Sequence, residues 1–474
     1  MDAVLGKTRR VHFIGVGGIG MSGIAELLAN LGYAVSGSDA KQSAVTERLA
    51  SLGVTVAASG HAAVNVGNAD VVVYSSAVRP DNPEVIEAKA RRIPVIPRAE
   101  MLAELMRLRF GIAVAGAHGK TSTTSMIALV LERAGLDPTA VIGGRLSAFG
   151  SNARLGRGEY MVAEADESDR SFLKLSPAVA VITNIDREHM DAYGGFADLQ
   201  QAFVDFANKV PFYGAVVACA DDAELSHVLP RFNRRVVTYG IDGHFDISAT
   251  GVALAGFGSR CNVVQRDIHS GRATELGELA LAVPGLHSVR NALAAVAVGL
   301  ELDVPFERIA SALAGFGGAE RRFERRGIVN GINVVDDYGH HPTEIAAVLS
   351  AARAANPARI IVAFQPHRYT RTRDLMQEFG QALATADEVV LTEIYAASEE
   401  PIPGITADAL AAAVSAGRRQ PARVVRKLDD LASAVADLAR PGDLVLTLGA
   451  GSIGGLATAL LAELERRHGP REVP

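Results

Sequence analysis

The sequence predicts an α/β fold with largely parallel sheets, and three observations support this. Strand-like apolar runs alternate with helix-like runs almost throughout the chain. This alternation restarts three times, and 474 residues are enough for about three domains. Hydrophobic residues make up 49% of the chain and charged residues 21%, which is typical of a folded protein and not of a disordered one.

Composition and charge exclude several classes of protein. The two cysteines, Cys219 and Cys261, cannot form a disulfide framework, so we expect them to be small buried residues in a reducing compartment. The first residues show no apolar segment followed by a cleavage site, and apolar runs such as 292–300 are too short to span a bilayer. A net charge of −6 argues against a nucleic-acid partner. We therefore expect a cytoplasmic protein with no membrane insertion.

The first series of strands is expected at 11–14, 33–36 and 71–75. The sequence GVGGIG at 15–20 follows the first of these strands and matches G-x-G-x-x-G, in which glycines let the backbone approach a diphosphate at a helix N-terminus. Asp39 follows about 20 residues later, where a carboxylate can accept a ribose hydroxyl. A dinucleotide, a nucleotide-diphosphate sugar and a tight turn without a ligand all remain compatible with this motif.

The second series is expected at 112–115, 160–163 and 179–183. GAHGKT at 116–121 ends like a phosphate-binding loop, in which backbone N–H groups cradle phosphate oxygens, Lys120 stabilises the terminal phosphates and Thr121 can bind Mg²⁺. A general P-loop has a glycine where this chain has Val114, so the motif is the shorter form G-x-x-G-K-T.

Two acidic or polar segments follow later strands of this second series. AEADESD at 163–169 ends in four carboxylates, a donor set that suits nucleotide-bound Mg²⁺, although it can also be a solvated acidic loop. TNIDREHMDAYG at 183–194 contains His189, a candidate metal ligand because ligands gather at the carboxyl ends of parallel strands. These segments favour a nucleotide and metal site.

The third series is expected at 332–335, 360–364, 388–392 and 444–448. A charged helical connector at 98–109 separates the first two series, and a glycine-rich segment with a charge run at 315–326 forms a plausible hinge before the third.

Together the motifs resemble the Mur ligase family, whose members form amide bonds with ATP in bacterial peptidoglycan precursor synthesis. The resemblance covers nearly the whole chain. It rests on the segments 116–121, 164–169, 183–189, PGLHSVRNALAA at 284–295, RRFE at 321–324 and DDYGHHPTE at 336–344. GVGGIGMSGIAELL at 15–28 and FQPHRYTRT at 364–372 resemble the branch that adds the first amino acid.

This resemblance implies an activity, its partners and a domain order. The partners would be UDP-N-acetylmuramate, L-alanine and ATP, with Mg²⁺ or Mn²⁺ as the metal. A Rossmann-like UDP-sugar domain would span 1–107, a central P-loop ATPase-type parallel sheet 108–322 and a Rossmann-like amino-acid domain 323–474. We expect a monomer or a weak homodimer.

The resemblance also implies site residues. The UDP-sugar contacts would be Gly15, Gly17, Gly18, Gly20, Asp39, Ser75 and Ser76. The ATP contacts would be Gly116, Ala117, His118, Gly119, Lys120, Thr121, Ser122, Asn184, His287, Asn291, Arg322 and Asp336. Thr121, Glu164 and His189 would serve the metal, and Tyr338, His340, Arg368 and Arg371 the amino acid. The catalytic set would be Lys120, His340, Arg368 and Arg371.

The residues of the third domain allow some independent reasoning. Arginine suits a carboxylate because its guanidinium fork offers two hydrogen bonds, although HRYTRTRD at 367–374 can also be an exposed basic helix start. His340 and His341 are adjacent and cannot both face one site if the segment is extended. We favour His340 as the residue that faces substrate and helps deprotonate the amine, and His341 as structural.

Two alternative functions remain at this point. A related ligase attaches a preformed peptide to the same UDP-sugar during cell-wall recycling and shares most of these motifs. An NAD-dependent oxidoreductase built on Gly15–Gly20 and Asp39 would leave Gly116–Thr121 and the third domain unexplained.

Overall fold

The computed structural model describes residues 5–57, 60–75, 77–146, 151–267, 270–416, 418 and 420–470. The chain forms two compact units, which are described separately. The first comprises Met1–Gly251, Cys261–Leu279 and Arg290–Phe316, and the second comprises Val252–Arg260, Ala280–Val289 and Gly317–Pro474. The last change of unit, between Phe316 and Gly317, lies inside the glycine-rich segment 315–326.

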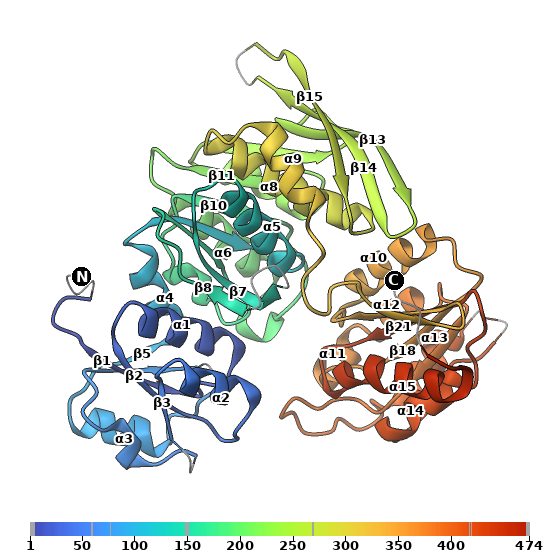
Figure 1. Ribbon diagram of the computed structural model, residues 1–474, viewed down its shortest axis with the longest axis horizontal. Helices are drawn as coiled ribbons and strands as arrows, with labels where there is room; N and C mark the ends of the chain where they lie inside the picture. Colours follow the sequence, from blue (N-terminus) through green and yellow to red (C-terminus); the bar gives the residue numbers. More distant parts are fainter. Residues whose placement is uncertain are drawn as a thin grey trace. The chain divides into compact units, whose positions relative to one another are not determined.

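The N-terminal part of the first unit is a five-stranded parallel sheet in the order β3-β2-β1-β4-β5. Helix α1 lies on one face of this sheet and α3 on the other (Figure 1). The strands are β1 (Arg10–Ile14), β2 (Ala34–Ser38), β3 (Thr55–Val56), β4 (Val71–Tyr74) and β5 (Val95–Pro97). The helices are α1 (Ile19–Asn30), α2 (Ala44–Ser51), the 3₁₀ turn η1 (Ala63–Val66), α3 (Pro83–Ala90) and α4 (Arg98–Met106). The predicted strands and helical connector are confirmed here.

The central sheet has ten strands in the order β15-β14-β13-β12-β11-β10-β6-β9-β7-β8. The strand pairs from β13 along the sheet to β7 are parallel. The edge strand β8 is antiparallel to β7. The strands nearest the site are β6 (Phe110–Ala115), β7 (Thr139–Leu146), β8 (Ser151–Arg154), β9 (Tyr160–Glu164) and β10 (Val179–Ile182). Those further out are β11 (Ala215–Cys219), β12 (Val236–Ile241), β13 (Ile247–Ala255), β14 (Gly258–Arg266) and β15 (Ala273–Leu281).

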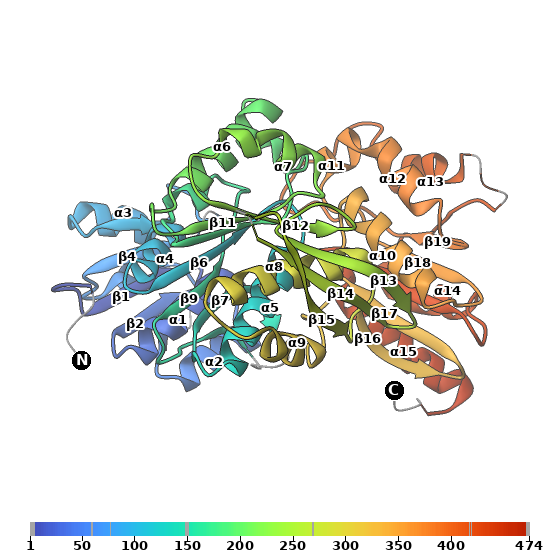
Figure 2. The same cartoon turned by 90° about the horizontal axis from the view of Figure 1, so that it is seen from above.

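Helices cover both faces of the central strands. Figure 2 shows α6 on one side of the strands and α5 with α9 on the other. These elements are α5 (Lys120–Arg133), α6 (Phe196–Asn208), α7 (Ala223–Val228), α8 (Leu286–Glu301) and α9 (Phe306–Ala314), with 3₁₀ turns η2 (Ser171–Lys174), η3 (Met190–Ala192) and η4 (Leu229–Arg231). Ten residues of α5, from Thr121 to Leu131, are buried, so the helix that follows the GAHGKT loop is a core element.

The second unit contains a six-stranded sheet in the order β16-β17-β21-β18-β19-β20. Strand β16 is antiparallel to its neighbour and the other pairs are parallel. The strands are β16 (Glu324–Val329), β17 (Ile332–Asp337), β18 (Ile360–Phe364), β19 (Glu388–Leu391), β20 (Arg423–Val424) and β21 (Leu444–Leu448). The helices are α10 (Pro342–Ala354), α11 (Tyr369–Asp374), α12 (Met376–Leu383), α13 (Ala407–Ser415), α14 (Leu428–Ala436), η5 (Ser452–Gly455) and α15 (Leu456–His468).

Two separate apolar cores lie on the two faces of this sheet. Residues of α10, α12 and α13 pack on one face, and residues of α14 and α15 pack on the other. Both cysteines, Cys219 and Cys261, are free and buried as expected. Within the described ranges, no helix combines the length and the apolar character that a bilayer crossing requires.

Candidate active site

The GAHGKT loop connects β6 to α5 and requires glycine at two positions. Gly116 has φ +135° and Gly119 has φ +81°, a region that favours glycine. A Cβ atom at Gly119 would lie 2.6 Å from Oδ1 of Asn291, so the Asn291 amide lies against the loop. This position fits the ATP contact that the resemblance implies for Asn291. The first turn of α5 directs N–H groups toward the loop, as in an anion-binding helix N-terminus.

Asn184, at the end of β10, braces the same loop. Its Oδ1 accepts a 2.8 Å hydrogen bond from the His118 N–H, and its Nδ2 donates to the His118 carbonyl at 2.9 Å. The Thr183 hydroxyl also donates to that carbonyl, at 2.6 Å. In this arrangement the Asn184 amide holds the shape of the loop.

Lys120 begins α5 and points back to the loop that precedes it. Its ammonium donates to the Gly116 carbonyl at 2.6 Å, to the Ala117 carbonyl at 3.1 Å and to Glu167 Oε1 at 2.9 Å. Burial by itself would lower the pKa of Lys120, but the carboxylates of Glu167, Glu164 and Asp166 outweigh it and raise that pKa. The ammonium is therefore charged whenever the fold is intact.

The four carboxylates of AEADESD have separate partners. Glu164 Oε2 accepts from the Thr121 hydroxyl at 3.0 Å and from the Gly143 N–H at 2.8 Å. Asp166 lies 3.5 Å from an Arg98 guanidinium nitrogen, and Glu167 pairs with Lys120. Asp169 accepts from the Ser171 N–H at 2.9 Å and closes a local turn. Only Glu164 adjoins Thr121, so these two residues fit a divalent cation at the phosphate loop.

His189 lies in the loop after β10, with φ +55°, and its Nε2 is 3.9 Å from Glu188. His118 Nε2 lies 2.9 Å from Asp186 in the same segment. Asp186, Glu188 and Glu167 also lie at this site, and sequence reasoning misses their roles although each stands within one of the two motifs 163–169 and 183–194. The sequence feature that could identify them is their position at the carboxyl ends of β9 and β10, where ligands gather in parallel sheets.

The first glycine loop is closed by Asp39. Oδ2 of Asp39 accepts a 2.8 Å hydrogen bond from the Gly17 N–H, and the N–H groups of Gly15 and Val16 donate to the Ser38 carbonyl. A side chain at Gly20 would begin 2.8 Å from the Arg98 guanidinium. The loop is thus held by hydrogen bonds to the end of β2, and Arg98 at the start of α4 lies beside Gly20.

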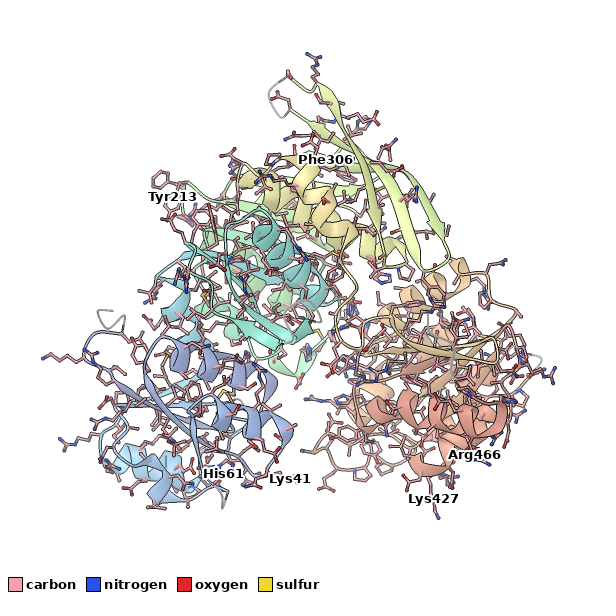
Figure 3. All side chains as sticks on the ribbon, viewed as in Figure 1. Lys41, His61, Tyr213, Phe306, Lys427 and Arg466 are labelled. Atoms are coloured by element: carbon pink, nitrogen blue, oxygen red, sulfur yellow. The ribbon has the colours of Figure 1, made fainter. Side chains whose placement is uncertain are left out.

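The other residues that the resemblance implies as UDP-sugar contacts lie on or beside this loop where the structure describes them. Gly18 precedes α1, and Ser75 follows β4 with its hydroxyl accepting from the Ala77 N–H at 3.2 Å. Ser76 lies outside the described residues. Lys41 and His61 lie at the same end of the five-stranded sheet (Figure 3), and His61 Nδ1 is 2.9 Å from the Ser38 hydroxyl.

In the second unit, DDYGHHPTE runs from β17 into α10. Asp336 is 1% exposed and engages Arg321 at 2.8 Å and the Thr447 hydroxyl at 2.6 Å. Asp337 accepts from the N–H groups of Phe323 and Gly339, and burial raises its pKa to about 6. Asp336 and Asp337 therefore anchor the segment 321–323 to the sheet.

Tyr338 and His340 leave this strand end side by side. The Arg321 and Arg322 guanidinium groups lie 5.4 and 5.2 Å from the Tyr338 ring centre. His340 Nδ1 is 3.1 Å from the Tyr338 carbonyl. His341 is the N-cap of α10 and accepts from the Thr343 N–H, which confirms its structural role.

The implied nucleotide contact His287, near the start of α8, has its ring against Gly285.

The two candidate amino-acid arginines belong to the start of α11. Arg368 is its N-cap with φ +72°, and Arg371 lies one turn later with a guanidinium nitrogen 3.2 Å from His367 Nδ1. The His367 ring is 5.7 Å from that of His340. Burial, together with the nearby His340 and the positive charges of the two arginines, lowers the pKa of His367 to about 3, so this imidazole is neutral. Sequence reasoning missed His367 although it adjoins Arg368.

The fold and this site define an ATP-dependent amide-bond ligase, and the chain belongs to the Mur ligase family. Three models of that family match it in order: "Mur ligase family, catalytic domain" at residues 10–110, "Mur ligase middle domain" at 114–299 and "Mur ligase, glutamate ligase domain" at 321–451.

Curated relatives and solved structures agree with this family. Proteins called UDP-N-acetylmuramate–L-alanine ligase from Geobacter sp. (strain M21) and Acidobacterium capsulatum are 54% and 55% identical to the chain. Both alignments cover 97% of this chain, and 98% and 99% of the relatives. The crystal structure of UDP-N-acetylmuramate-alanine ligase from Thermotoga maritima is 30% identical, with a TM-score of 0.81 over 97% of this chain and 99% of that one. A murein peptide ligase from Psychrobacter arcticus is 26% identical, with a TM-score of 0.70 over 96% and 98% of the two chains.

Proposed function

We propose that this chain joins L-alanine to the lactyl carboxylate of UDP-N-acetylmuramate and converts ATP to ADP and phosphate, in peptidoglycan precursor synthesis. The observation that supports this most directly is the arrangement of Lys120, Thr121 and Glu164 at the carboxyl ends of β6 and β9. The curated relatives at 54% identity carry the name of this activity.

The reaction needs an activated carboxylate because amide formation in water is uphill. The γ-phosphoryl group of ATP passes to the lactyl carboxylate, which gives an acyl phosphate and ADP. The alanine amine then attacks the acyl carbon, the C–O bond to phosphate breaks, and the amine loses a proton. Lys120 and the N-terminus of α5 neutralise the negative charge of the phosphates, which is the main requirement of phosphoryl transfer.

Magnesium, or manganese, fits the donor set at this loop. The Thr121 hydroxyl and Glu164 Oε2 are 3.0 Å apart, and hydroxyl and carboxylate oxygens are the ligands these cations prefer. Thr121, Glu164 and His189 would hold the metal, which when bound neutralises charge on the transferred phosphoryl group.

The amino-acid end of the reaction is assigned to the second unit. Arg368 and Arg371 would bind the alanine carboxylate, with Tyr338 and His340 beside it. If Nδ1 of His340 carries a proton toward the Tyr338 carbonyl, Nε2 is the nitrogen that can accept the proton of the amine. His340→Ala should then lower kcat at saturating alanine, and a variant with wild-type kcat and alanine KM would contradict this role.

The remaining assignments complete the proposal. Gly15, Gly17, Gly18 and Gly20 would bind the UDP diphosphate, with Asp39, Ser75 and Ser76 around it, and Asn291, Arg322, His287 and Asp336 would surround ATP. The three domains would span 1–107, 108–322 and 323–474. We expect the protein to act in the cytoplasm as a monomer or a weak homodimer.

One assay tests the function and its main alternative. The protein is incubated with UDP-N-acetylmuramate, ATP, Mg²⁺ and either single amino acids or a preformed peptide, and phosphate release and product mass are measured. Alanine-dependent phosphate release with a product one alanyl residue heavier supports the proposal. Turnover with the peptide alone would identify the recycling type of ligase, and no turnover with alanine would contradict the proposal. The oxidoreductase alternative is set aside because ligase models match all three parts of the chain.

A further inference from the structure

All three N–H donors of the Lys120 ammonium have acceptors in this structure, and one of them forms a buried ion pair with Glu167. An ammonium group has three N–H donors. In this structure they go to the carbonyls of Gly116 and Ala117 and to Glu167 Oε1, at 2.6, 3.1 and 2.9 Å. A phosphate group can therefore bind Lys120 only if at least one of these three partners is released.

Glu167 is the partner that differs from the other two. Its side chain is 2% exposed, and its second oxygen, Oε2, is buried and has no hydrogen-bond partner among the residues that the structure describes. The backbone at Glu167 is fixed, because its carbonyl accepts from the Tyr193 hydroxyl at 2.5 Å and from the Arg170 N–H at 3.1 Å. A fully buried carboxylate with one unsatisfied oxygen is costly to keep charged.

The charges around Glu167 show what keeps it there. Burial raises the pKa of its carboxyl to about 7, the Lys120 charge opposes that effect, and Asp166 adds to it. Asp166 is itself paired with Arg98 and accepts from the Ser168 N–H at 3.0 Å. An ionised carboxylate only accepts hydrogen bonds, so Asp166 offers no donor to Glu167. Lys120 is the cation that stabilises the Glu167 charge, and a backbone N–H group contributes to the same effect.

We propose that Glu167 is a positioning residue that holds the Lys120 ammonium against the loop in the absence of nucleotide and is replaced by ATP phosphate oxygens on binding. The carbonyls of Gly116 and Ala117 are backbone groups of the loop that wraps the phosphates, so they stay with the phosphate site. Glu167 follows β9 and carries a negative charge that phosphate also carries, so it is the partner that exchanges. This role rests on the proposed function, because it takes the loop as the ATP site.

The exchange has a measurable consequence for ATP affinity. In the wild type, ATP must break the ion pair and approach an additional negative charge. Glu167→Gln keeps the size of the side chain and an acceptor oxygen but removes the charge. We expect this variant to bind a non-hydrolysable ATP analogue about three- to tenfold more tightly, with a parallel fall in the ATP KM and no rise in kcat. Glu167→Asp, which keeps the charge, should have an affinity closer to that of the wild type.

The experiment is titration calorimetry of the full chain with the ATP analogue and Mg²⁺. Glu159→Gln is the matched control, since Glu159 is exposed and lies just before the same strand. Analogue affinity in Glu167→Gln that equals or falls below that of the wild type overturns the proposal, because a purely structural carboxylate would give that result. If the wild type itself binds no analogue, the proposed function fails instead.

A second measurement does not depend on how the variant folds. In a crystal structure of the wild-type chain with the analogue, Lys120 Nζ should lie beyond hydrogen-bond distance, more than about 3.5 Å, from Glu167 Oε1. An intact Lys120–Glu167 bond beside bound phosphates would overturn the exchange.

Discussion

The Asp39 carboxylate accepts a 2.8 Å hydrogen bond from the Gly17 N–H, and so closes the first glycine loop from the end of β2. This relationship predicts that Asp39→Ala loosens the loop and raises the KM for UDP-N-acetylmuramate about tenfold with little change in kcat. Asp39→Asn should have a smaller effect because an amide oxygen can still accept from Gly17. Steady-state kinetics with varied sugar nucleotide checks this. Asp81→Ala, at an exposed ion pair with Arg79, is the control, and equal KM values for both variants would contradict the prediction.

A buried carboxylate in the N-terminal sheet predicts acid sensitivity. Glu84 is 0% exposed. Burial alone would raise its pKa, but hydrogen bonds from His12, Ser38, Asn65 and the Ala62 N–H outweigh it and lower that pKa to about 2. A depressed pKa stabilises the fold above the ordinary value of 4.5, and this contribution is lost as the pH falls from 4.5 toward 2.

Glu84→Gln should therefore lower the free energy of unfolding by about 2 kcal/mol at pH 7, and the difference from wild type should shrink below pH 4.5. Urea unfolding at pH 7, 4.5 and 3, followed by circular dichroism, measures this difference. Glu87→Gln, a partly exposed position on the same helix, should change stability by less than about 0.5 kcal/mol at each pH. A pH-independent difference for Glu84→Gln would contradict the assignment.

Alanine substitutions at two glycines with nearly equal φ distinguish the effect of backbone strain from that of steric contact at the ATP loop. Gly119 has φ +81° and Gly135 has φ +83°. A Cβ atom at Gly119 would lie 2.6 Å from Asn291 Oδ1, whereas one at Gly135 would meet no atom of the described residues within 4 Å. Gly119→Ala should raise the ATP KM more than tenfold because Asn291 must move. Gly135→Ala should lower stability by about 1 kcal/mol without affecting the ATP KM. A similar ATP KM in the two variants would show that the contact with Asn291 does not matter.

The metal assignment predicts different effects for two threonines on one helix. Thr121 donates to Glu164 at 3.0 Å, whereas the Thr123 hydroxyl is buried and has no hydrogen-bond partner within the described part of the chain. Thr121→Val should raise the Mg²⁺ concentration needed for half-maximal activity about tenfold or more, because one oxygen ligand is lost. Thr123→Val should leave it unchanged. Activity measured against Mg²⁺ at fixed ATP tests this, and an unchanged Mg²⁺ requirement in Thr121→Val would remove Thr121 from the metal site.

The amino-acid assignment predicts a selective effect on alanine. Arg371→Lys keeps the charge but loses the guanidinium fork, so the alanine KM should rise about tenfold while the ATP KM stays the same. Arg373→Lys is the matched control, because Arg373 is on the same helix and pairs with the exposed Asp374. Comparison of alanine KM values in the two variants decides the matter. Equal values would place the carboxylate-binding group elsewhere.

Local pattern was sufficient for much of the fold. The apolar runs at 360–364 and 444–448 form β18 and β21 at those residues, and the helical connector at 98–109 contains α4. These runs are short, mostly apolar and bounded by polar or glycine residues, so the sequence signal is local. Strands β13 to β15 are not among those that the sequence predicts. Along β14 exposed and buried residues alternate, and such a strand depends on its partners for its place in the sheet.

At the site, the amino-acid sequence is enough to identify the chemical groups that are present: a phosphate loop with Lys120 and Thr121, carboxylates at and after the end of β9, and arginines at α11. Glycine spacing and the alternation of strands and helices are local properties, and they also indicated that both loops follow strands. How these groups pair depends on the folded chain. It placed Glu164 on Thr121 and Glu167 on Lys120, and it turned Asp39 toward Gly17. The physical reason is that a carboxylate has the same composition wherever it stands, while its charge state and its partner depend on burial and on neighbours distant in the chain.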